Sequence, residues 1–331
     1  MAAPVTDGGT CAVGMQYFVF KKVARDVAEA NGFTFADSPH AAYRAGCRNL
    51  ILVDNVTERA GFIAGHWRRE VGGDVVFYAV TEGPPTISPR AGYGRALAAA
   101  ATIVAPSNFA RQMIEEAGFR VEAVVPHGAR VPERARGLAE RKWALVYRAY
   151  YMKRKFPPYG ISAVRLAVRE GIPVEVFVRD ALHPQGLEPR HQALRQVLQF
   201  TPSPEEPEEM VYDQLSSYAF FLNLADGGGF ELEVLESMAL GTPVVTAYFP
   251  PISEYYPKNE LTFDTVGEWE EHFPYLTIVH HEYRPEDMLE AMRRAISMDR
   301  RRWESLSSEL RERAKEYDYR KVYQAFARLV G

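Results

Sequence analysis

The 331-residue sequence lacks several features that would assign it to a particular class of protein. It contains only two cysteines, Cys11 and Cys47, so we expect no disulfide framework and infer a reducing, intracellular setting. No window holds the ~20 apolar residues that cross a bilayer, and no basic stretch followed by an apolar run marks a signal peptide. A cytoplasmic protein with at most peripheral membrane contact is therefore predicted.

The sequence also lacks the charge patterns that bind nucleic acid or a metal ion. The formal net charge is −4 at pH 7, so no basic field favours nucleic acid as a partner. There is no Asp-x-Asp pair to hold a nucleotide-bound divalent ion, and His280-His281 has no third ligand at useful spacing. We therefore predict no metal site and no cofactor. The remaining composition, 47% hydrophobic and 25% charged, is that of an ordinary globular protein.

Apolar strand patterns alternate with helical patterns along the chain, whose length suggests about two domains. Ser107 is expected to cap a helix that places Phe109 and Met113 on its core side. The alternation predicts mostly parallel sheets covered on both faces, an α/β fold. Strands are expected at 49–53, 74–80, 102–105, 123–125, 144–147, 174–178 and 220–224, and helices at 15–30, 58–70, 161–170 and 285–330.

The segment from Gly227 to Val245 is the most informative part of the chain, because Gly227, Gly228 and Gly229 open a helix-forming run that ends before a β-branched strand. Glycine lets an anion approach the backbone, and the first N–H groups of a helix lack internal partners. The helix dipole adds partial positive charge, so this end suits a phosphate or diphosphate. Glu236, over a turn into the helix, is placed to accept hydrogen bonds from hydroxyl groups that the phosphate carries. An ordinary turn–helix–strand unit is the alternative.

This segment resembles the donor-binding segment of the retaining nucleotide-sugar glycosyltransferases of GT-B fold, the family-4 group. Gly229-Phe230 and the run from Glu236 to Val245 match the family pattern closely. The resemblance implies that Glu236 binds the ribose of the donor. The family's first glutamate, which contacts the transferred sugar, falls on Gly228, so Asp226 or Glu231 is expected to substitute for it.

Other segments resemble the same family in the same order. Val104 to Phe109 and Val125 to Gly128 resemble segments of its first domain, and Tyr317-Asp318-Tyr319 resembles the start of the segment that crosses back onto that domain. The resemblance implies two Rossmann-like, doubly wound parallel-sheet domains that face each other across a cleft. We place the acceptor domain at 1–136, the donor domain at 137–313, and a C-terminal helix that packs back on the first domain at 314–331.

Basic residues follow the first strand expected in the second domain. In the family, an arginine at this strand end and a basic residue five or six positions later clamp the diphosphate, and Arg148 with Lys153 or Arg154 matches that spacing. Such cations, together with the amides of Gly227 to Phe230, stabilise the charge that grows on the leaving group. A solvated basic loop is the alternative.

The first domain offers candidates that are less specific. The stretch Thr6 to Gly14, with Gly8 and Gly9, resembles the glycine loop that meets the diphosphate from the other domain of the family, although a simple turn explains it equally well. Where the family often has a histidine, this chain has Thr81-Glu82. Glu82 is either a base for the acceptor hydroxyl, with its pKa raised by burial, or an ordinary loop carboxylate.

The function implied by the resemblance is metal-independent transfer of a sugar from a nucleotide-diphosphate donor to the hydroxyl of a sugar, lipid or protein acceptor, with retention of configuration. Arg148, Lys153 and Glu82 would carry the catalysis. One alternative is a GT-B-fold sugar-nucleotide epimerase, which needs a cluster of carboxylates and histidines. Another is a catalytically degenerate sugar-nucleotide binder. The donor sugar, its base and the acceptor stay open because loop shape sets them.

Overall fold

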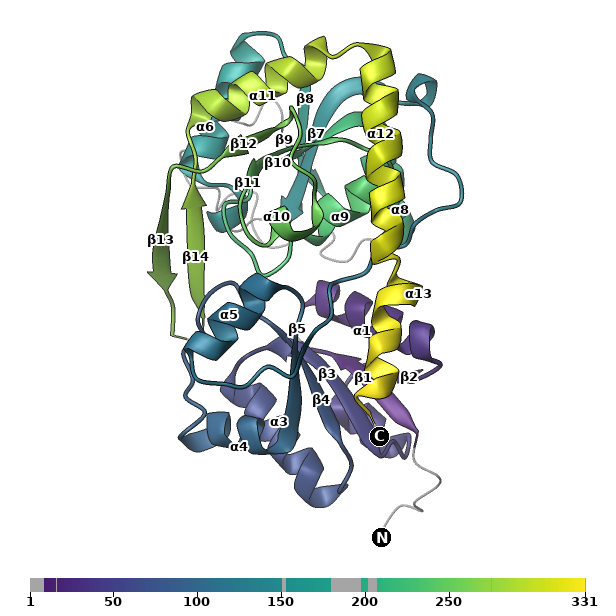
Figure 1. The fold of residues 1–331 in the computed structure, drawn as a ribbon, viewed down its shortest axis with the longest axis vertical. Coiled ribbons are helices and arrows are strands. Elements are labelled where there is room, and N and C mark those ends of the chain that lie inside the picture. Colours follow the sequence, from purple (N-terminus) through teal and green to yellow (C-terminus); the bar gives the residue numbers. More distant parts are fainter. Residues whose placement is uncertain are drawn as a thin grey trace. The chain divides into compact units, whose positions relative to one another are not determined.

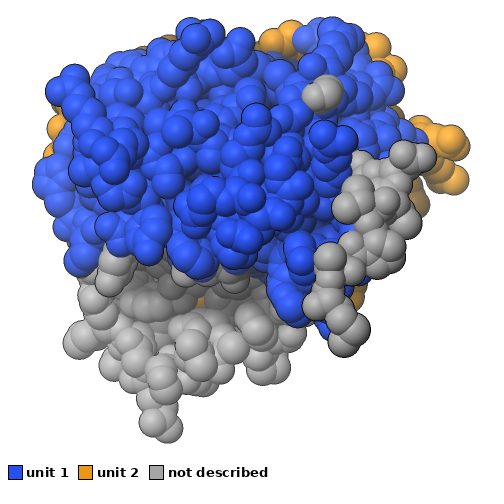
Figure 2. Space-filling model, turned by 90° about the horizontal axis from the view of Figure 1, so that it is seen from below, with its two compact units in different colours: residues 1–128, 270–278, 316–331 blue, residues 129–269, 279–315 orange. Residues whose placement is uncertain are grey.

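The computed structural model describes residues 9–15, 17–150, 153–179, 198–201, 207–274 and 276–330, with the backbone alone at 150, 153, 179 and 198–201. The chain divides into two compact units, shown in Figures 1 and 2. Unit 1 comprises Met1–Gly128, Glu270–Ile278 and Glu316–Gly331, and unit 2 comprises Ala129–Trp269 and Val279–Lys315. The sequence pattern placed the boundaries at 136 and 313, whereas the units change at 128 and 315, and it did not indicate that 270–278 belongs with unit 1.

Unit 1 is built on a six-stranded sheet in the order β2-β1-β3-β4-β5-β6, and every strand pair in it is parallel. Strands and helices alternate along the chain as predicted. Their bounds are β1 Thr10–Gly14, α1 Phe18–Asn31, β2 Thr34–Phe35, α2 Pro39–Arg44, β3 Asn49–Asn55, α3 Glu58–Glu70, β4 Val75–Val80, α4 Gly92–Ala100, β5 Ala101–Ala105, α5 Asn108–Glu116 and β6 Ala123–Val124.

Both faces of this sheet are buried. Along β3, Leu50 and Leu52 enter one core cluster, while Ile51 and Val53 enter the other. Successive side chains of a strand point to opposite faces, so a strand covered on both sides is apolar at every position. The cap predicted at Ser107 is confirmed, because its Oγ accepts a hydrogen bond from the N–H of the third residue of α5 at 3.0 Å.

The structure corrects the interpretation of the two cysteines. Cys11, in β1, and Cys47, in the loop after α2, form a disulfide whose Cα atoms are 5.8 Å apart. Both residues are buried in the core cluster that also contains Leu50 and Leu52. The 36-residue separation carried no local signal of pairing, because β1 and this loop meet only through the packing of the sheet.

The carboxyl-terminal segment packs on unit 1, as predicted, but it forms three short helical pieces and not one helix. It contains η3 Lys315–Tyr317, α13 Tyr319–Val322 and η4 Tyr323–Arg328. Tyr319, Tyr323 and Phe326 are buried in the core cluster that α1 also lines. The Tyr323 hydroxyl accepts a hydrogen bond from the Gly128 N–H at 2.9 Å, so the segment is fixed by a polar contact as well as by apolar packing.

Unit 2 has a second six-stranded parallel sheet, in the order β12-β11-β10-β7-β8-β9. Two parallel α/β sheets are therefore confirmed. Helix α6 packs against α11, and α9 packs against α8 and α12. The bounds are η1 Leu138–Glu140, β7 Lys142–Tyr150, η2 Lys153–Lys155, α6 Pro158–Arg169, β8 Val174–Arg179, β9 Leu198–Thr201, α8 Glu208–Ser216, β10 Tyr218–Asn223, α9 Leu232–Ala239, β11 Val244–Tyr248, α10 Ile252–Tyr255, β12 Thr262–Asp264, α11 Pro285–Ser297 and α12 Arg300–Ala314.

A two-stranded sheet, β13 Gly267–His272 and β14 Thr277–Glu282, was not predicted. β13 is almost entirely exposed, whereas β14 is buried along most of its length. The chain passes between the two units within both strands. No helix among the residues that the structure describes is long and apolar enough to cross a bilayer.

Candidate functional site

The three glycines lie in the loop between β10 and α9, and all three are buried. This loop follows the carboxyl end of β10, an inner strand flanked by β11 and β7, and parallel α/β sheets bind ligands at that edge. The helix begins at Leu232, with Glu231 at the N-cap, and not at the glycines as the sequence pattern suggested. Glycine is a poor helix former, so the glycines extend the loop ahead of the helix.

Glu231 is the centre of the charged contacts beside this loop. Its side chain is 3% exposed, its carboxylate is paired with Lys155 Nζ, and its Oε1 lies 3.6 Å from Arg154 Nη1. A Cβ atom at Gly228 would lie 2.2 Å from Glu231 Oε1, so this carboxylate occupies the space that a side chain at 228 would fill. Arg154 also donates a hydrogen bond to the Gly227 carbonyl at 3.3 Å. Two cations therefore hold both the carboxylate and the loop backbone.

Asp226 comes directly before the glycines and is 2% exposed. Its Oδ1 lies 2.9 Å from His280 Nδ1, and its Oδ2 accepts a hydrogen bond from the Tyr159 hydroxyl. Its N–H donates to the Arg154 carbonyl at 3.1 Å, and its carbonyl accepts from the His281 N–H at 2.6 Å. Burial, reinforced by the charge of Asp226, raises the pKa of Tyr159, so the hydroxyl stays protonated as a donor. Both carboxylate oxygens of Asp226 thus have partners.

Glu236 lies in the second turn of α9 and is 3% exposed. The apolar side chains Leu235 and Met238 on the same helix are completely buried. The loop and the first two turns of α9 therefore carry three nearly buried carboxylates within eleven residues, of which Glu236 is the last. Such a density of buried acid requires nearby cations or hydrogen-bond donors.

The basic residues predicted to bind the diphosphate lie in two consecutive elements, β7 and η2. Arg148 is the seventh residue of β7, in register with Phe177, and is completely buried, because the strand continues to Tyr150 instead of ending before Arg148. Lys153 begins η2, and its side chain lies outside the described part. Arg154 and Lys155 lie beside the glycine loop with side chains 12% and 15% exposed.

In unit 1, Gly9 lies at the amino end of β1, the edge opposite to the one where parallel α/β sheets bind ligands. This placement argues against Gly9 as a donor ligand, and Gly8 lies outside the described residues. The carboxyl end of β1 carries Gly14, where a Cβ would lie 2.1 Å from the Phe20 carbonyl oxygen, so a side chain does not fit there. Glu82 follows the carboxyl end of β4, as predicted, and is half-buried.

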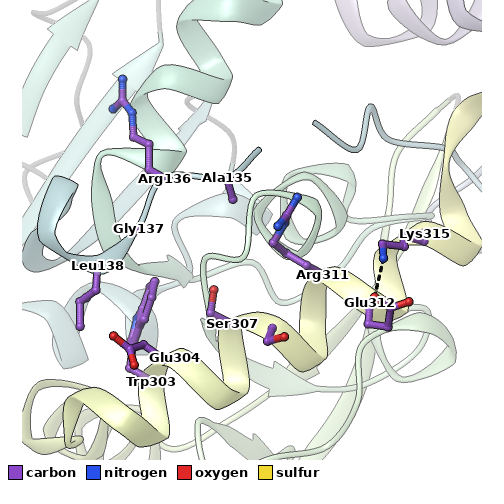
Figure 3. Close-up of a pocket in the computed structure, with 11 residues that line it drawn as sticks. Ala135, Arg136, Gly137, Leu138, Trp303, Glu304, Ser307, Arg311, Glu312 and Lys315 are labelled. Atoms are coloured by element: carbon purple, nitrogen blue, oxygen red, sulfur yellow. Dashed lines mark hydrogen bonds and ion pairs between the residues drawn. The ribbon is translucent and has the colours of Figure 1, made fainter. Parts of the chain in front are cut away.

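A pocket of about 280 Å³ lies in unit 2 between residues 135–138 and one side of α12, as Figure 3 shows. Its Ser307 donates a hydrogen bond to the Gly241 carbonyl at 2.6 Å, which places the pocket at the carboxyl end of α9, away from the glycine loop. Lys315 and Glu312, side by side at one end of it, are paired with each other. None of the predicted site residues lines this pocket.

Residues distant in sequence complete the loop's surroundings, and sequence reasoning missed them. The Tyr255 ring stacks on Phe230 with centroids 4.5 Å apart, and its hydroxyl donates to the Glu231 carbonyl at 2.8 Å. Tyr159 and His280 contact Asp226 from 67 and 54 residues away, so no local pattern marks them. Within the described ranges, no group of three or more His, Cys, Asp or Glu side chains is arranged to hold a metal ion.

Comparison with known proteins supports the resemblance found in the motifs. No protein-family model matches the chain. A curated relative, "Uncharacterized glycosyltransferase 335" of Sulfolobus islandicus rod-shaped virus 1, is 39% identical over 103 residues, which are 30% of this chain and 30% of the relative's length.

Among solved structures, sucrose-phosphate synthase from Thermosynechococcus elongatus has a TM-score of 0.64 at 14% identity, covering 88% of this chain and 76% of that one. A UDP-forming α,α-trehalose-phosphate synthase from Burkholderia xenovorans has a TM-score of 0.58 at 14% identity, covering 94% and 78%. The chain therefore has the GT-B fold that its motifs predicted.

Proposed function

We propose that this chain transfers a sugar from a nucleotide-diphosphate sugar to an acceptor hydroxyl, with retention of configuration and without a metal ion. The observation that carries the proposal is the glycine loop at the carboxyl end of β10, where Arg154 and Lys155 lie beside the Gly227 carbonyl and the Glu231 carboxylate. Cations and backbone amides stabilise the charge that develops on a leaving diphosphate. The fold similarity to a UDP-forming synthase supports the same class of reaction.

The proposed roles follow the placement of each residue. Arg154 and Lys155, with the loop amides of Gly227 to Phe230, bind the diphosphate, and Glu236 binds the ribose. Arg148 and Lys153 stay predicted diphosphate ligands; Arg148 is completely buried in β7, whereas Arg154 and Lys155 are partly buried beside the glycine loop.

Gly228 stands where the family has the glutamate that contacts the transferred sugar. Asp226 and Glu231 are the two candidates to replace it. Asp226 already uses both oxygens, one on His280 and one on Tyr159. Glu231 Oε1 lies 3.6 Å from Arg154 Nη1, which is longer than a hydrogen bond, and stands where a side chain at 228 would stand. We therefore assign Glu231, and not Asp226, to the hydroxyl groups of the transferred sugar.

In the proposed reaction the bond between the anomeric carbon and the diphosphate oxygen breaks, and the acceptor oxygen bonds to the same face of that carbon. The acceptor proton passes to the departing diphosphate oxygen. Arg154 and Lys155 stabilise the negative charge on that diphosphate. Glu82, at the carboxyl end of β4, orients the acceptor hydroxyl as a hydrogen-bond acceptor.

The first test is a thermal-shift screen with UDP, GDP, ADP and their glucose conjugates, in EDTA and in Mg²⁺. We expect one nucleotide to raise the unfolding midpoint equally in both buffers, because ligand binding to the native state stabilises it. Glu236→Gln should weaken that binding about tenfold, the size of one hydrogen bond to a charged group, whereas Glu290→Gln on the exposed face of α11 should not. No shift with any nucleotide, or equal binding by Glu236→Gln, would contradict the proposal.

One observation favours a second function on the same fold. The buried pair Asp226–His280, beside the glycine loop, is the kind of carboxylate–histidine pair that a sugar-nucleotide epimerase needs for proton abstraction. An epimerase returns an intact, epimerised nucleotide sugar, whereas a transferase releases the nucleoside diphosphate. NMR of the products from each nucleotide sugar distinguishes the two, and a degenerate binder gives neither product.

A further inference from the structure

The residues just before the glycines, Leu224 to Asp226, are hydrogen-bonded to other elements of unit 2. The Tyr283 hydroxyl, just beyond β14, donates to the Leu224 carbonyl at 2.7 Å, and the His281 N–H donates to the Asp226 carbonyl at 2.6 Å. The carboxylate of Asp226 is bound by His280 from β14 and by Tyr159 from α6. Residue 226 is therefore the point where η2, α6 and β14 converge on the loop.

The His280 ring is itself fixed in place. It is 3% exposed and stacks on the Trp269 ring, with centroids 4.1 Å apart and planes 8° from parallel. Stacking on the ring face and the 2.9 Å contact between Nδ1, at the ring edge, and Asp226 Oδ1 restrict the orientation of the ring. A histidine constrained in this way transmits its own position to the carboxylate that it binds.

From these contacts we infer that His280 is a positioning residue that, through Asp226 and with Tyr159, sets the conformation of the Gly227–Gly229 loop for the donor diphosphate. The inference rests on the proposed function, and it gives Asp226 a role that does not require contact with the sugar. Gly227 follows Asp226 directly in the chain, so a shift of the anchored carboxylate moves the first loop amide. Glycine backbone has the widest conformational freedom, so this loop needs the anchor at Asp226 in addition to the Arg154 contact at Gly227.

His281 supplies a matched control beside His280. It is 2% exposed, stacks on Phe249 with centroids 4.5 Å apart, and places its Nδ1 3.0 Å from Glu268 Oε1. The Glu268 side chain, however, is 62% exposed and belongs to β13, not to the loop. The two histidines thus match in burial, stacking and carboxylate contact, and differ in whether the carboxylate belongs to the loop.

The test compares His280→Ala, His280→Asn, Tyr159→Phe and His281→Ala in the full chain. Asparagine retains a donor near the position of Nδ1, and phenylalanine retains the ring that packs edge-on against Tyr283 at 4.5 Å. The rate of hydrogen exchange in the peptide 224–231 measures how firmly the loop is held when no ligand is present. Titration with UDP, GDP and ADP measures the nucleotide affinity of the donor site.

We expect His280→Ala and Tyr159→Phe to speed exchange in 224–231 and to weaken nucleotide binding about tenfold, the effect of losing one hydrogen bond to a charged group. His280→Asn should return both readouts close to wild type, and His281→Ala should change neither, even where it lowers the midpoint of unfolding. Wild-type exchange in His280→Ala, or equal loss in His281→Ala, overturns the inference. Absence of nucleotide binding by wild type overturns the proposed function instead, and the exchange data still decide the role of His280.

Discussion

Acid should destabilise unit 1 through one buried histidine. His127 is 4% exposed, with its Nδ1 3.0 Å from the Tyr78 hydroxyl and 3.4 Å from the Tyr323 hydroxyl. Burial, and after it the charge of Lys22, lowers the pKa of His127 from 6.5 to about 3. The native state therefore keeps this ring neutral down to a pH at which the unfolded chain has already taken up a proton.

The sign and size of the effect follow from that difference. A histidine whose folded pKa lies below its unfolded pKa contributes stability that is complete above pH 6.5 and is lost as the pH falls toward the folded value. Each pH unit in that window costs ~1.4 kcal/mol, so the change from pH 7 to pH 5 should cost about 2 kcal/mol. The result is the same for any folded pKa below about 4, so it does not depend on the depth of the shift.

The assay is urea unfolding at pH 7 and pH 5 for wild type, His127→Asn and His66→Asn. Pulse-labelled protection of the β4 amides, Val75–Val80, reports the unfolding of unit 1. His127→Asn should be less stable at pH 7 but should lose about 2 kcal/mol less than wild type between the two pH values. His66, exposed on α3, is the matched control and should leave the pH dependence unchanged. Equal pH dependence in wild type and His127→Asn refutes the reasoning.

Two further predictions concern packing and charge. Gly128→Ala should destabilise unit 1 by about 2 kcal/mol, because the new Cβ would lie 2.4 Å from the Tyr319 Cα. Gly9→Ala should not destabilise it, because no atom lies within 4 Å of a Cβ there. Thermal unfolding of both variants checks this. Lys155→Met should cost unit 2 about 3 kcal/mol by leaving the buried Glu231 carboxylate without its closest cation, and Lys155→Met with Glu231→Leu should cost less in urea unfolding. A double variant as unstable as the sum of the single ones contradicts the pairing.

The fold was predictable where its determinants are local. The pattern at 58–70 predicted α3 to the residue, and the cap at Ser107 predicted the start of α5, because periodicity and caps are read within a few positions. β13 could not be found in this way. Its residues are exposed on both faces and largely charged, so it lacks both the alternation and the apolar run that mark strands. The disulfide of Cys11 with Cys47 was missed for a related reason, since only the folded sheet brings the two together.

For the candidate site, the sequence names the carboxylates, but their roles depend on the partner that each one meets. Asp226 and Glu231 are five residues apart and equally buried, and a motif alone treats them as equivalent replacements at Gly228. In the folded chain Asp226 binds a histidine and a tyrosine, and this contact fixes the loop entry, while Glu231 meets the cations of η2. Both oxygens of Asp226 contact buried partners within hydrogen-bond distance, whereas Glu231 is paired with Lys155 at Oε2 and lies 3.6 Å from Arg154 at Oε1, so Glu231 Oε1 is the more open acceptor for a sugar hydroxyl. Which carboxylate anchors the loop and which binds the sugar is therefore set by contacts between residues 54 to 76 positions apart. Substituting the partner of each carboxylate, His280 or Lys155, distinguishes the two roles better than substituting the carboxylate itself.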